Sequence, residues 1–501
     1  MRIRKKSCIF AEFLIRYLTM KKILSFIFVL FVCASASVTQ AKDFGVPSES
    51  EDVMLQAFYW DSYTLTKYGR TKWIDLLKDT AAINDNFDLV WFPPSASSSG
   101  GVGYIPAKMD NQDNTAWGQM GKLRTLINGL HRRGTKVIAD IVVNHRGNKS
   151  SWCDFYEDDF GLYGKFQLTS EHICSNDEGF TNKESNCYGS SVHGAKDSGT
   201  DFAGARDLDH TSAYVRKWVK AYLSWMQGNM KYDGFRYDMT LGYSSEYLSE
   251  YNESAQPYFT VSEYWEGIDK QVQHLKDANF NTMVFDFPLK YKLHDAINGN
   301  ALGQLKNPAN SLRGKGFAKY AVTFIDNHDT FERSDNQWGE FIKYNADLSQ
   351  NMVKNKILQA NAYILMMPGI PCVFWPHWKS YTAEINEMIA IRKRAGIHSE
   401  SEVLEESGQG NKYEATIVGH RGTVILRLGA GRSKDVPEGY ELAADGDIYN
   451  AYSIYIKMKE EGIETVNGER LTVKGEKFME NGQLYILVGE KVFDARGCVV
   501  E

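Results

Sequence analysis

The chain has 501 residues, of which 43% are hydrophobic and 24% charged, so it carries enough apolar material for a large folded core. Its 57 lysines and arginines are outnumbered by 63 aspartates and glutamates, giving a net charge of −6 at pH 7. This balance argues against nucleic acid as a partner, because a polyanion is bound by a basic surface. One large domain with additions, or several smaller ones, fits the length.

Residues 1–41 have the pattern of a secretory signal peptide. A basic stretch containing Lys21 and Lys22 precedes an apolar run over 23–32, and small residues follow, with Ala41 as a cleavage point. The run is shorter than the ~20 residues that a membrane-spanning helix needs, and no later stretch is long and apolar enough. We therefore expect removal of this segment, with Met20 as an alternative start. The mature protein is then periplasmic, surface-bound or secreted.

From residue 53 the chain alternates short β-rich runs with amphipathic helical patterns such as 119–134 and 212–227. Eight runs are predicted strands: 53–60, 87–94, 135–145, 232–239, 258–265, 281–287, 321–328 and 370–375. This count is typical of an α/β fold, the (β/α)8 TIM barrel. A doubly wound open sheet is the alternative, but its Gly-rich phosphate loop after the first strand is missing.

Two regions break the alternation. Residues 146–209 form a long Gly-, Ser- and Asn-rich segment with little helical period, which predicts a subdomain inserted after the third strand. Residues 398–501 change to short alternating runs with Gly-rich turns, which predicts a C-terminal antiparallel β domain. The catalytic barrel is expected over 42–397.

Three cysteines, Cys153, Cys174 and Cys187, cluster in the inserted segment, where export permits a disulfide. Their spacing contains no CxxC pair, which argues against zinc. Three candidates leave at least one thiol over, so the pairing stays open.

Charged residues gather where the predicted strands end, and barrel active sites lie at the carboxyl ends of the strands. The third strand ends with Asp140, Asn144 and His145, the fourth with Arg236 and Asp238, the fifth with Glu263, and the seventh with His328 and Asp329. Charges in a barrel mouth repel one another or demand partners, so this convergence indicates a catalytic site rather than isolated structural pairs.

Asp238 and Glu263 follow neighbouring strands, which are about 4.7–4.9 Å apart. That places their carboxyl groups near the ~5–5.5 Å spacing of retaining glycosidases. Arg236 lies on the same face as Asp238, where its cation favours an ionised nucleophile. Glu263 stands between apolar Val261 and Trp265 and faces another negative charge, so we expect its pKa to be raised and the group to serve as the acid.

The stretches "DIVVNH", "DGFRYDM", "VSEYW" and "FIDNHDT" resemble, in order and spacing, the four signature regions of the alpha-amylase family of glycoside hydrolases. "VWFPPS", "GYIP", "LGYS" and "PGIPCVFW" make the chain most similar to plant-type alpha-amylases and their bacterial relatives. By this resemblance Asp238 matches the nucleophile, Glu263 the general acid/base and Asp329 the third acid. Four further residues match substrate-binding positions: Tyr104, His145, Arg236 and His328.

The resemblance also implies a calcium ion between the barrel and the inserted segment. The positions matching its ligands are Asn144, Asp197, Thr200, Asp201, Asp207 and the carbonyl of Gly242. Oxygen donors of this kind suit a hard cation.

The implied function is a secreted, retaining alpha-amylase that cleaves internal α-1,4-glucosidic bonds of starch, glycogen and maltodextrins, acting as a monomer. An α-glucan transglycosylase of the same family is the alternative. A catalytically inactive glucan-binding protein is a third hypothesis, and the presence of all three acids argues against it.

Overall fold

The computed structural model describes residues 44–100, 102–113, 115–332 and 352–459, and the backbone of three strands between 476 and 494. The predicted signal peptide over 1–41 lies outside the described residues. Among those described, no helix combines the length and apolar character that crossing a membrane requires.

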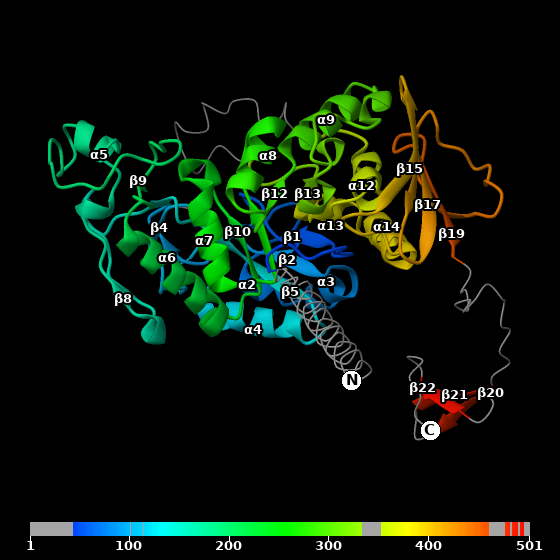
Figure 1. The fold of residues 1–501 in the computed structure, drawn as a ribbon, viewed down its shortest axis with the longest axis horizontal. Coiled ribbons are helices and arrows are strands. Elements are labelled where there is room, and N and C mark those ends of the chain that lie inside the picture. The colour runs from blue at the N-terminus through cyan, green and yellow to red at the C-terminus, as the bar shows by residue number, and fades with distance from the viewer. Residues whose placement is uncertain are drawn as a thin grey trace, which may run out of the picture.

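Eight parallel strands close into a barrel at the centre of the molecule (Figure 1). They are β1 (Met54–Gln56), β2 (Leu89–Trp91), β5 (Lys136–Ile141), β10 (Gly234–Tyr237), β11 (Phe259–Ser262), β12 (Met283–Phe285), β13 (Ala321–Phe324) and β14 (Ile370–Phe374). Each strand pairs with the next along this series, and β14 pairs with β1. All eight predicted strands are present, shorter than their β-rich runs, and the predicted barrel is confirmed.

Helices cover the outside of the barrel, each with its apolar stripe facing the strands. They include α3 (Thr80–Asn86), α4 (Met120–His131), α6 (Ala213–Trp225), α7 (Ser245–Ala255), α8 (Ile268–Asp277), α9 (Phe287–Asn298), α12 (Ile357–Met366) and α14 (Thr382–Ala395). The strands carry near-continuous buried apolar residues, as expected when both faces of a parallel sheet are covered.

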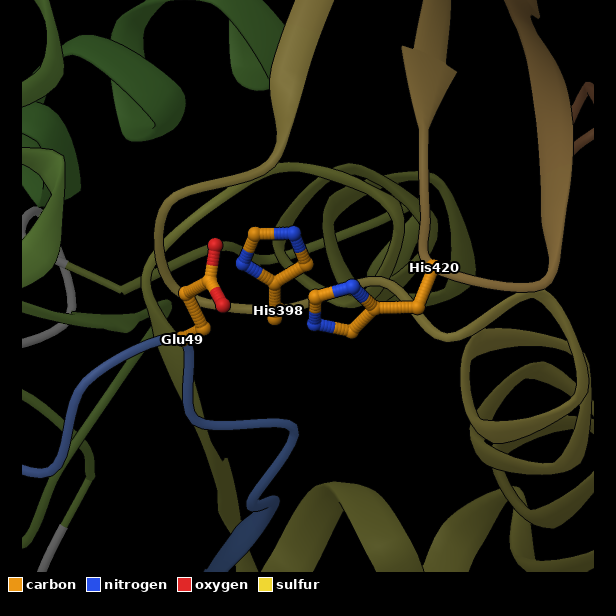
Figure 2. Close-up of side chains that lie close together, drawn as sticks. All are labelled: Glu49, His398 and His420. Carbon is orange, nitrogen blue, oxygen red and sulfur yellow. The ribbon is translucent and has the colours of Figure 1, made fainter. Parts of the chain in front are cut away.

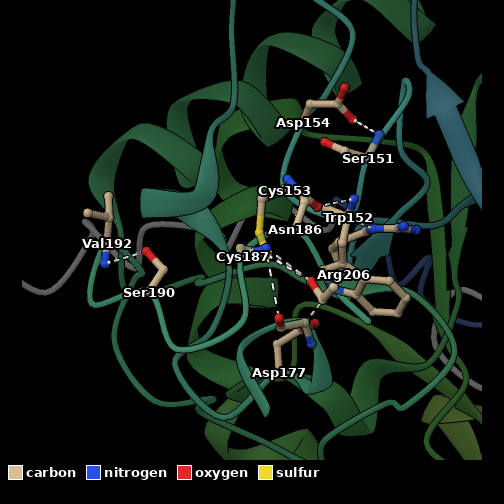
Figure 3. The surroundings of a disulfide bond; sticks show 12 residues. Ser151, Trp152, Cys153, Asp154, Asp177, Asn186, Cys187, Ser190, Val192 and Arg206 are labelled. Carbon is tan, nitrogen blue, oxygen red and sulfur yellow. Dashed lines mark hydrogen bonds between the residues drawn. A yellow bond between two sulfur atoms is a disulfide. The ribbon is translucent and has the colours of Figure 1, made fainter. Parts of the chain in front are cut away.

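The segment between β5 and α6 contains two short antiparallel sheets, in which β6 (His145–Arg146) pairs with β9 (Arg206–Asp207) and β7 (Asp158–Asp159) pairs with β8 (Lys165–Phe166). Cys153 and Cys187 form a disulfide across it (Figure 3). Cys174 is buried as a free thiol. Beside this disulfide the Arg206 guanidinium lies 4.0 Å from the centre of the Trp152 ring. A buried ion pair, Arg146 to Asp158 at 2.9 Å, fixes the segment against α6, whose Trp218 also donates to Asp158.

After α14 the chain forms a five-stranded antiparallel sheet in the order β15-β16-β17-β19-β18. Its strands are β15 (Glu402–Gln409), β16 (Lys412–Val418), β17 (Gly422–Gly429), β18 (Glu441–Asp445) and β19 (Tyr452–Met458). It lies against α12 and α14 (Figure 1). The buried ring of Tyr413 contacts that of Tyr363 there. A second antiparallel sheet contains β20 (Glu476–Glu480), β21 (Gln483–Val488) and β22 (Lys491–Asp494). The predicted C-terminal antiparallel sheet is confirmed, whereas the exact domain boundaries stay a prediction.

Candidate functional site

The predicted catalytic residues meet at the carboxyl ends of the barrel strands. Asp238 is the first residue after β10, Glu263 the first after β11, and Asp329 follows β13 in a short loop. Because β10 and β11 are paired in parallel register, with Tyr237 opposite Ser262, the two residues that follow leave the sheet side by side.

Arg236 is the centre of the site. Its Nη1 donates to Asp238 Oδ1 over 2.7 Å and to Asp140 Oδ1 over 2.8 Å, and its Nη2 lies 2.9 Å from Glu263 Oε1. All four side chains are buried. One cation therefore faces three carboxyl groups. If all three were ionised, the cluster would carry a net negative charge, which protonation of a carboxyl group reduces.

Burial raises the pKa of Glu263 to about 8 and that of Asp238 to about 7, although Arg236 opposes both shifts. The rise at Glu263 has the direction expected from the sequence. At Asp238 the expected lowering by Arg236 is present but burial outweighs it, because the same guanidinium is shared among three carboxyl groups. A raised pKa at Glu263 suits a residue that must carry a proton as the acid.

Met239 adopts an uncommon backbone conformation next to Asp238. Its φ is +44°, in the left-handed region that a non-glycine residue rarely occupies. This turn directs its backbone N–H to Glu263 Oε2 over 2.9 Å, so the strained residue helps hold the acid.

The four residues matched to substrate positions also lie on this rim. The Tyr104 hydroxyl donates to Asp140 over 2.8 Å, and its ring stacks on His328 with centroids 5.1 Å apart. His145 Nε2 lies 2.8 Å from the Tyr104 carbonyl oxygen, which only accepts, so this nitrogen carries the proton. Burial lowers the pKa of His145 to about 4, so the ring is neutral at pH 7.

Residues outside the predicted set complete the rim. Gln56 Nε2 lies 3.1 Å from His328 Nδ1, Trp60 Nε1 donates to Asp329 Oδ1 over 3.2 Å, and Phe202 stacks on His145. Asp140 accepts from Arg236, Tyr104 and Trp91. Its position at the start of "DIVVNH" was a signal for Asp140. Gln56 and Trp60 belong to the first predicted strand, and Phe202 lies in the stretch "DFAGARDLDH" of the inserted segment.

Three of the predicted metal ligands form one acidic cluster. Carboxylate oxygens of Asp197, Asp201 and Asp207 lie within 4.8 Å of one another. Asn144 donates to Asp207 over 3.2 Å, and its Oδ1 packs so closely on Gly242 that an added Cβ would lie 1.9 Å away. The Thr200 N–H donates to the carbonyl of Leu241, which brings this segment beside Gly242 as well.

The charges of this cluster fit a cation. Burial, together with the neighbouring acids Asp197, Asp177 and Asp201, raises the pKa of Asp207 to about 9. Asp197 Oδ2 is buried and has no hydrogen-bond partner among the described residues. Hard oxygen donors with closely spaced negative charges are the kind of group that suits a metal ion.

A closed (β/α)8 barrel that holds paired carboxyl groups at its carboxyl rim fits a glycoside hydrolase. A family model described as the alpha-amylase catalytic domain matches residues 83–377. The chain belongs to the alpha-amylase family and is a glycoside hydrolase of the alpha-amylase type.

Plant relatives confirm the resemblance read from the motifs. Probable alpha-amylase 2 of Arabidopsis thaliana is 29% identical over 427 residues, covering 80% of this chain and 94% of the relative. Chloroplastic alpha-amylase 3 of the same plant is 28% identical over 428 residues, again 80% of this chain but 44% of the relative, so the chain spans less than half of that protein.

Two solved structures share the fold. The alpha-amylase of Geobacillus thermoleovorans, complexed with acarbose, superposes with a TM-score of 0.55 at 16% identity, covering 83% of this chain and all (100%) of that one. The Gamma-CGTASE of alkalophilic Bacillus clarkii gives 0.60 at 12% identity, covering 91% of this chain and 82% of that one. At these identities the likeness shows the fold alone.

Proposed function

We propose that the protein is a secreted, calcium-dependent alpha-amylase that hydrolyses internal α-1,4-glucosidic bonds of starch, glycogen and maltodextrins with retention of configuration. The observation that carries the proposal is the bonding of one buried guanidinium, Arg236, to Asp238 and Glu263 from neighbouring strands. Two carboxyl groups held by one fork are close enough for acid and nucleophile, with little room for an intervening water.

In the first step a carboxylate oxygen of Asp238 forms a bond to the anomeric carbon while the bond to the leaving oxygen breaks. Glu263 gives its proton to that oxygen. In the second step Glu263 takes a proton from water, whose oxygen attacks the anomeric carbon and releases Asp238. The raised pKa of Glu263, about 8, supports the acid role in the first step.

The rim residues hold the sugar in place. Asp329, oriented by Trp60 and by His328 at 3.1 Å, grips sugar hydroxyls at the cleavage point. His145 and His328 line the same part of the rim, and Tyr104 supplies a flat face for the sugar ring.

Calcium is the metal that the oxygen donors of Asn144, Asp197, Thr200, Asp201, Asp207 and Gly242 suit best, and these residues would hold it. Its positive charge would offset the acidic cluster. Asn144 precedes His145 in the chain, so an ordered cluster holds a substrate residue in position. The proposed secretion rests on residues 1–41, and the monomeric state and the lack of a nucleic acid partner stay predictions.

The first experiment follows anomeric proton NMR signals while the protein, started at Lys42, digests maltoheptaose with calcium present. Early α-anomer that nearly vanishes with Glu263→Gln is the expected result. Early β-anomer would mean an inverting site and a wrong assignment. Products longer than the substrate would indicate the transglycosylase. Absence of cleavage would favour a glucan-binding protein or an enzyme that acts on a different glucosidic linkage.

A further inference from the structure

A cluster of two histidines and a glutamate lies far from the catalytic rim. Glu49, His398 and His420 each offer one ligand atom, and these atoms lie within 4.8 Å of one another. Figure 2 shows the three side chains converging from three segments: the chain before β1, the loop after α14, and the turn between β16 and β17.

The cluster stands at the opposite end of the barrel from the acids. The Gly369 N–H, immediately before β14, donates to the carbonyl of Ser399, the residue after His398. The cluster is therefore beside the amino-terminal ends of the strands, the face of a (β/α)8 barrel that serves stability rather than catalysis.

The backbone fixes all three positions. The His420 N–H donates to the Gly396 carbonyl over 2.9 Å, and the His398 N–H donates to Ser401 Oγ over 3.0 Å. Glu49 has a φ of +45°, an uncommon left-handed conformation for glutamate, and its N–H donates to the carboxylate of Glu400 over 2.8 Å. Strain of this kind persists where surrounding bonds hold it, so the backbone at Glu49 is held in one conformation.

The side chains themselves are available to a ligand. Neither the Glu49 carboxylate nor the His420 ring has a hydrogen bond or an ion pair with another side chain or backbone group in the described part of the chain. His398 is buried, and its Nδ1 accepts a long 3.3 Å hydrogen bond from the Glu400 N–H, which a metal at this nitrogen would replace. The two imidazoles stack at 4.1 Å, which keeps the donors together.

We propose that Glu49, His398 and His420 form a binding site for a divalent transition metal of the Zn²⁺ class, which joins the segment before β1 and the loop after α14 to the C-terminal sheet. Two imidazoles and one carboxylate are a ligand set that Zn²⁺ takes, in contrast to the all-oxygen cluster at Asp207. Ligand atoms on a tetrahedral zinc are about 3.3 Å apart. Glu49 and His420 are exposed, so short side-chain rotations, with His420 turning out of the stack, close the remaining distance.

The function of the site is stabilisation. A metal that binds the folded chain and not the unfolded one raises the free energy of unfolding. The ion would add a further connection at a junction where the Arg421 guanidinium already pairs with Glu51 over 2.9 Å and the Ser399 N–H bonds to the Ser50 carbonyl.

The test titrates Zn²⁺, and Co²⁺ as a coloured substitute, into tag-free, chelator-treated protein kept in excess calcium so that the acidic cluster is saturated. Calorimetry gives the stoichiometry, the visible absorption of Co²⁺ reports nitrogen ligands, and thermal unfolding reports stabilisation. We expect one equivalent to bind and the melting temperature to rise. His420→Ala and Glu49→Gln should each weaken binding at least about tenfold.

Both variants change exposed side chains, so they are expected to fold, and each is checked by its activity without zinc. His193→Ala, an exposed histidine in the inserted segment, is the matched control and should bind Zn²⁺ like the parent. Absence of saturable binding at micromolar protein would overturn the proposal. So would equal affinity in parent and His420→Ala, or a loss of binding in His193→Ala alone.

Discussion

Arg236 Nη2 lies 2.9 Å from Oε1 of Glu263, so the arginine expected to serve Asp238 also forms an ion pair with the acid. A lysine keeps the charge but has no planar fork, and it cannot hold both carboxyl groups in the same geometry. We expect Arg236→Lys to lower kcat/KM on maltoheptaose by about 10²–10³-fold, the range found when one preorganised donor is lost. Arg133→Lys, at an exposed pair with Asp85, is the matched control and should keep full activity. Unchanged turnover in Arg236→Lys would contradict the bridging role.

The two carboxyl groups are distinguished by rescue with azide, an anion that attacks without a general base. Glu263→Gln should lose about 10²–10⁴-fold of its turnover on maltoheptaose, the range of general acid/base catalysis. On a substrate whose leaving group needs no proton, azide should restore turnover and give the α-glycosyl azide, because it attacks the covalent intermediate on Asp238. The complementary experiment uses Asp238→Gly with a β-glycosyl fluoride and an added sugar acceptor, and it should give an α-linked transfer product. If Asp238→Gly gave the azide rescue and Glu263→Gln gave the transfer product, the two roles would be reversed.

Glu263 also makes stability depend on pH. Its folded pKa is raised from 4.5 to about 8, so its contribution to stability is fully present below 4.5 and is lost as pH rises through about 8. Glu263→Gln keeps the shape and removes the buried charge. The free energy of unfolding of the variant should therefore gain on the parent as pH rises across this window. Chemical denaturation at several pH values with calcium present measures the difference, and a gap that stays constant or shrinks would argue against a buried, strained carboxylate.

The barrel and most of its rim were predictable from the sequence because both follow local patterns. In a β-rich run such as the one ending at Phe374, the spacing of the apolar residues differs from that in the helix after it, so strands and helices can be told apart. Residues that directly follow the strands of a parallel barrel all lie at the same end of the barrel. Asp238, Glu263 and Asp329 were therefore brought together as expected.

Contacts that depend on side-chain geometry or on distant segments were not predictable. Nothing local indicates that Arg236 reaches Glu263, or that Cys153 rather than Cys174 pairs with Cys187. The cluster of Glu49, His398 and His420 is assembled only when the C-terminal sheet docks on the barrel. No single stretch of sequence carries its pattern.

Removal of calcium should destabilise the protein in a pH-dependent way. Without the ion, the folded pKa of Asp207 is raised from 3.8 to about 9, so the stability it contributes is present below 3.8 and lost as pH rises through about 9. We expect chelation to lower the melting temperature more at high pH than at low pH. Free calcium at 100 times its Kd should restore about 2.7 kcal/mol. Asp207→Asn should lose most of this gain, and a chelator without effect on the parent would refute a calcium site here.

The disulfide Cys153–Cys187 closes a loop within the inserted segment. Cys153 and Cys187 are 34 residues apart, and closing a loop of this length restricts the unfolded chain by an amount equivalent to about 3–4 kcal/mol. The double variant Cys153→Ser, Cys187→Ser should lower the free energy of unfolding by up to that amount. It should also weaken calcium binding, because Asp197, Asp201 and Asp207 lie in the same segment. Cys174→Ala, at the buried free thiol, is the control and should keep the calcium affinity of the parent. If the double variant retained the parent's affinity, the metal cluster would be ordered independently of the bridge, with the barrel residue Asn144 and the β6–β9 pairing holding it in place.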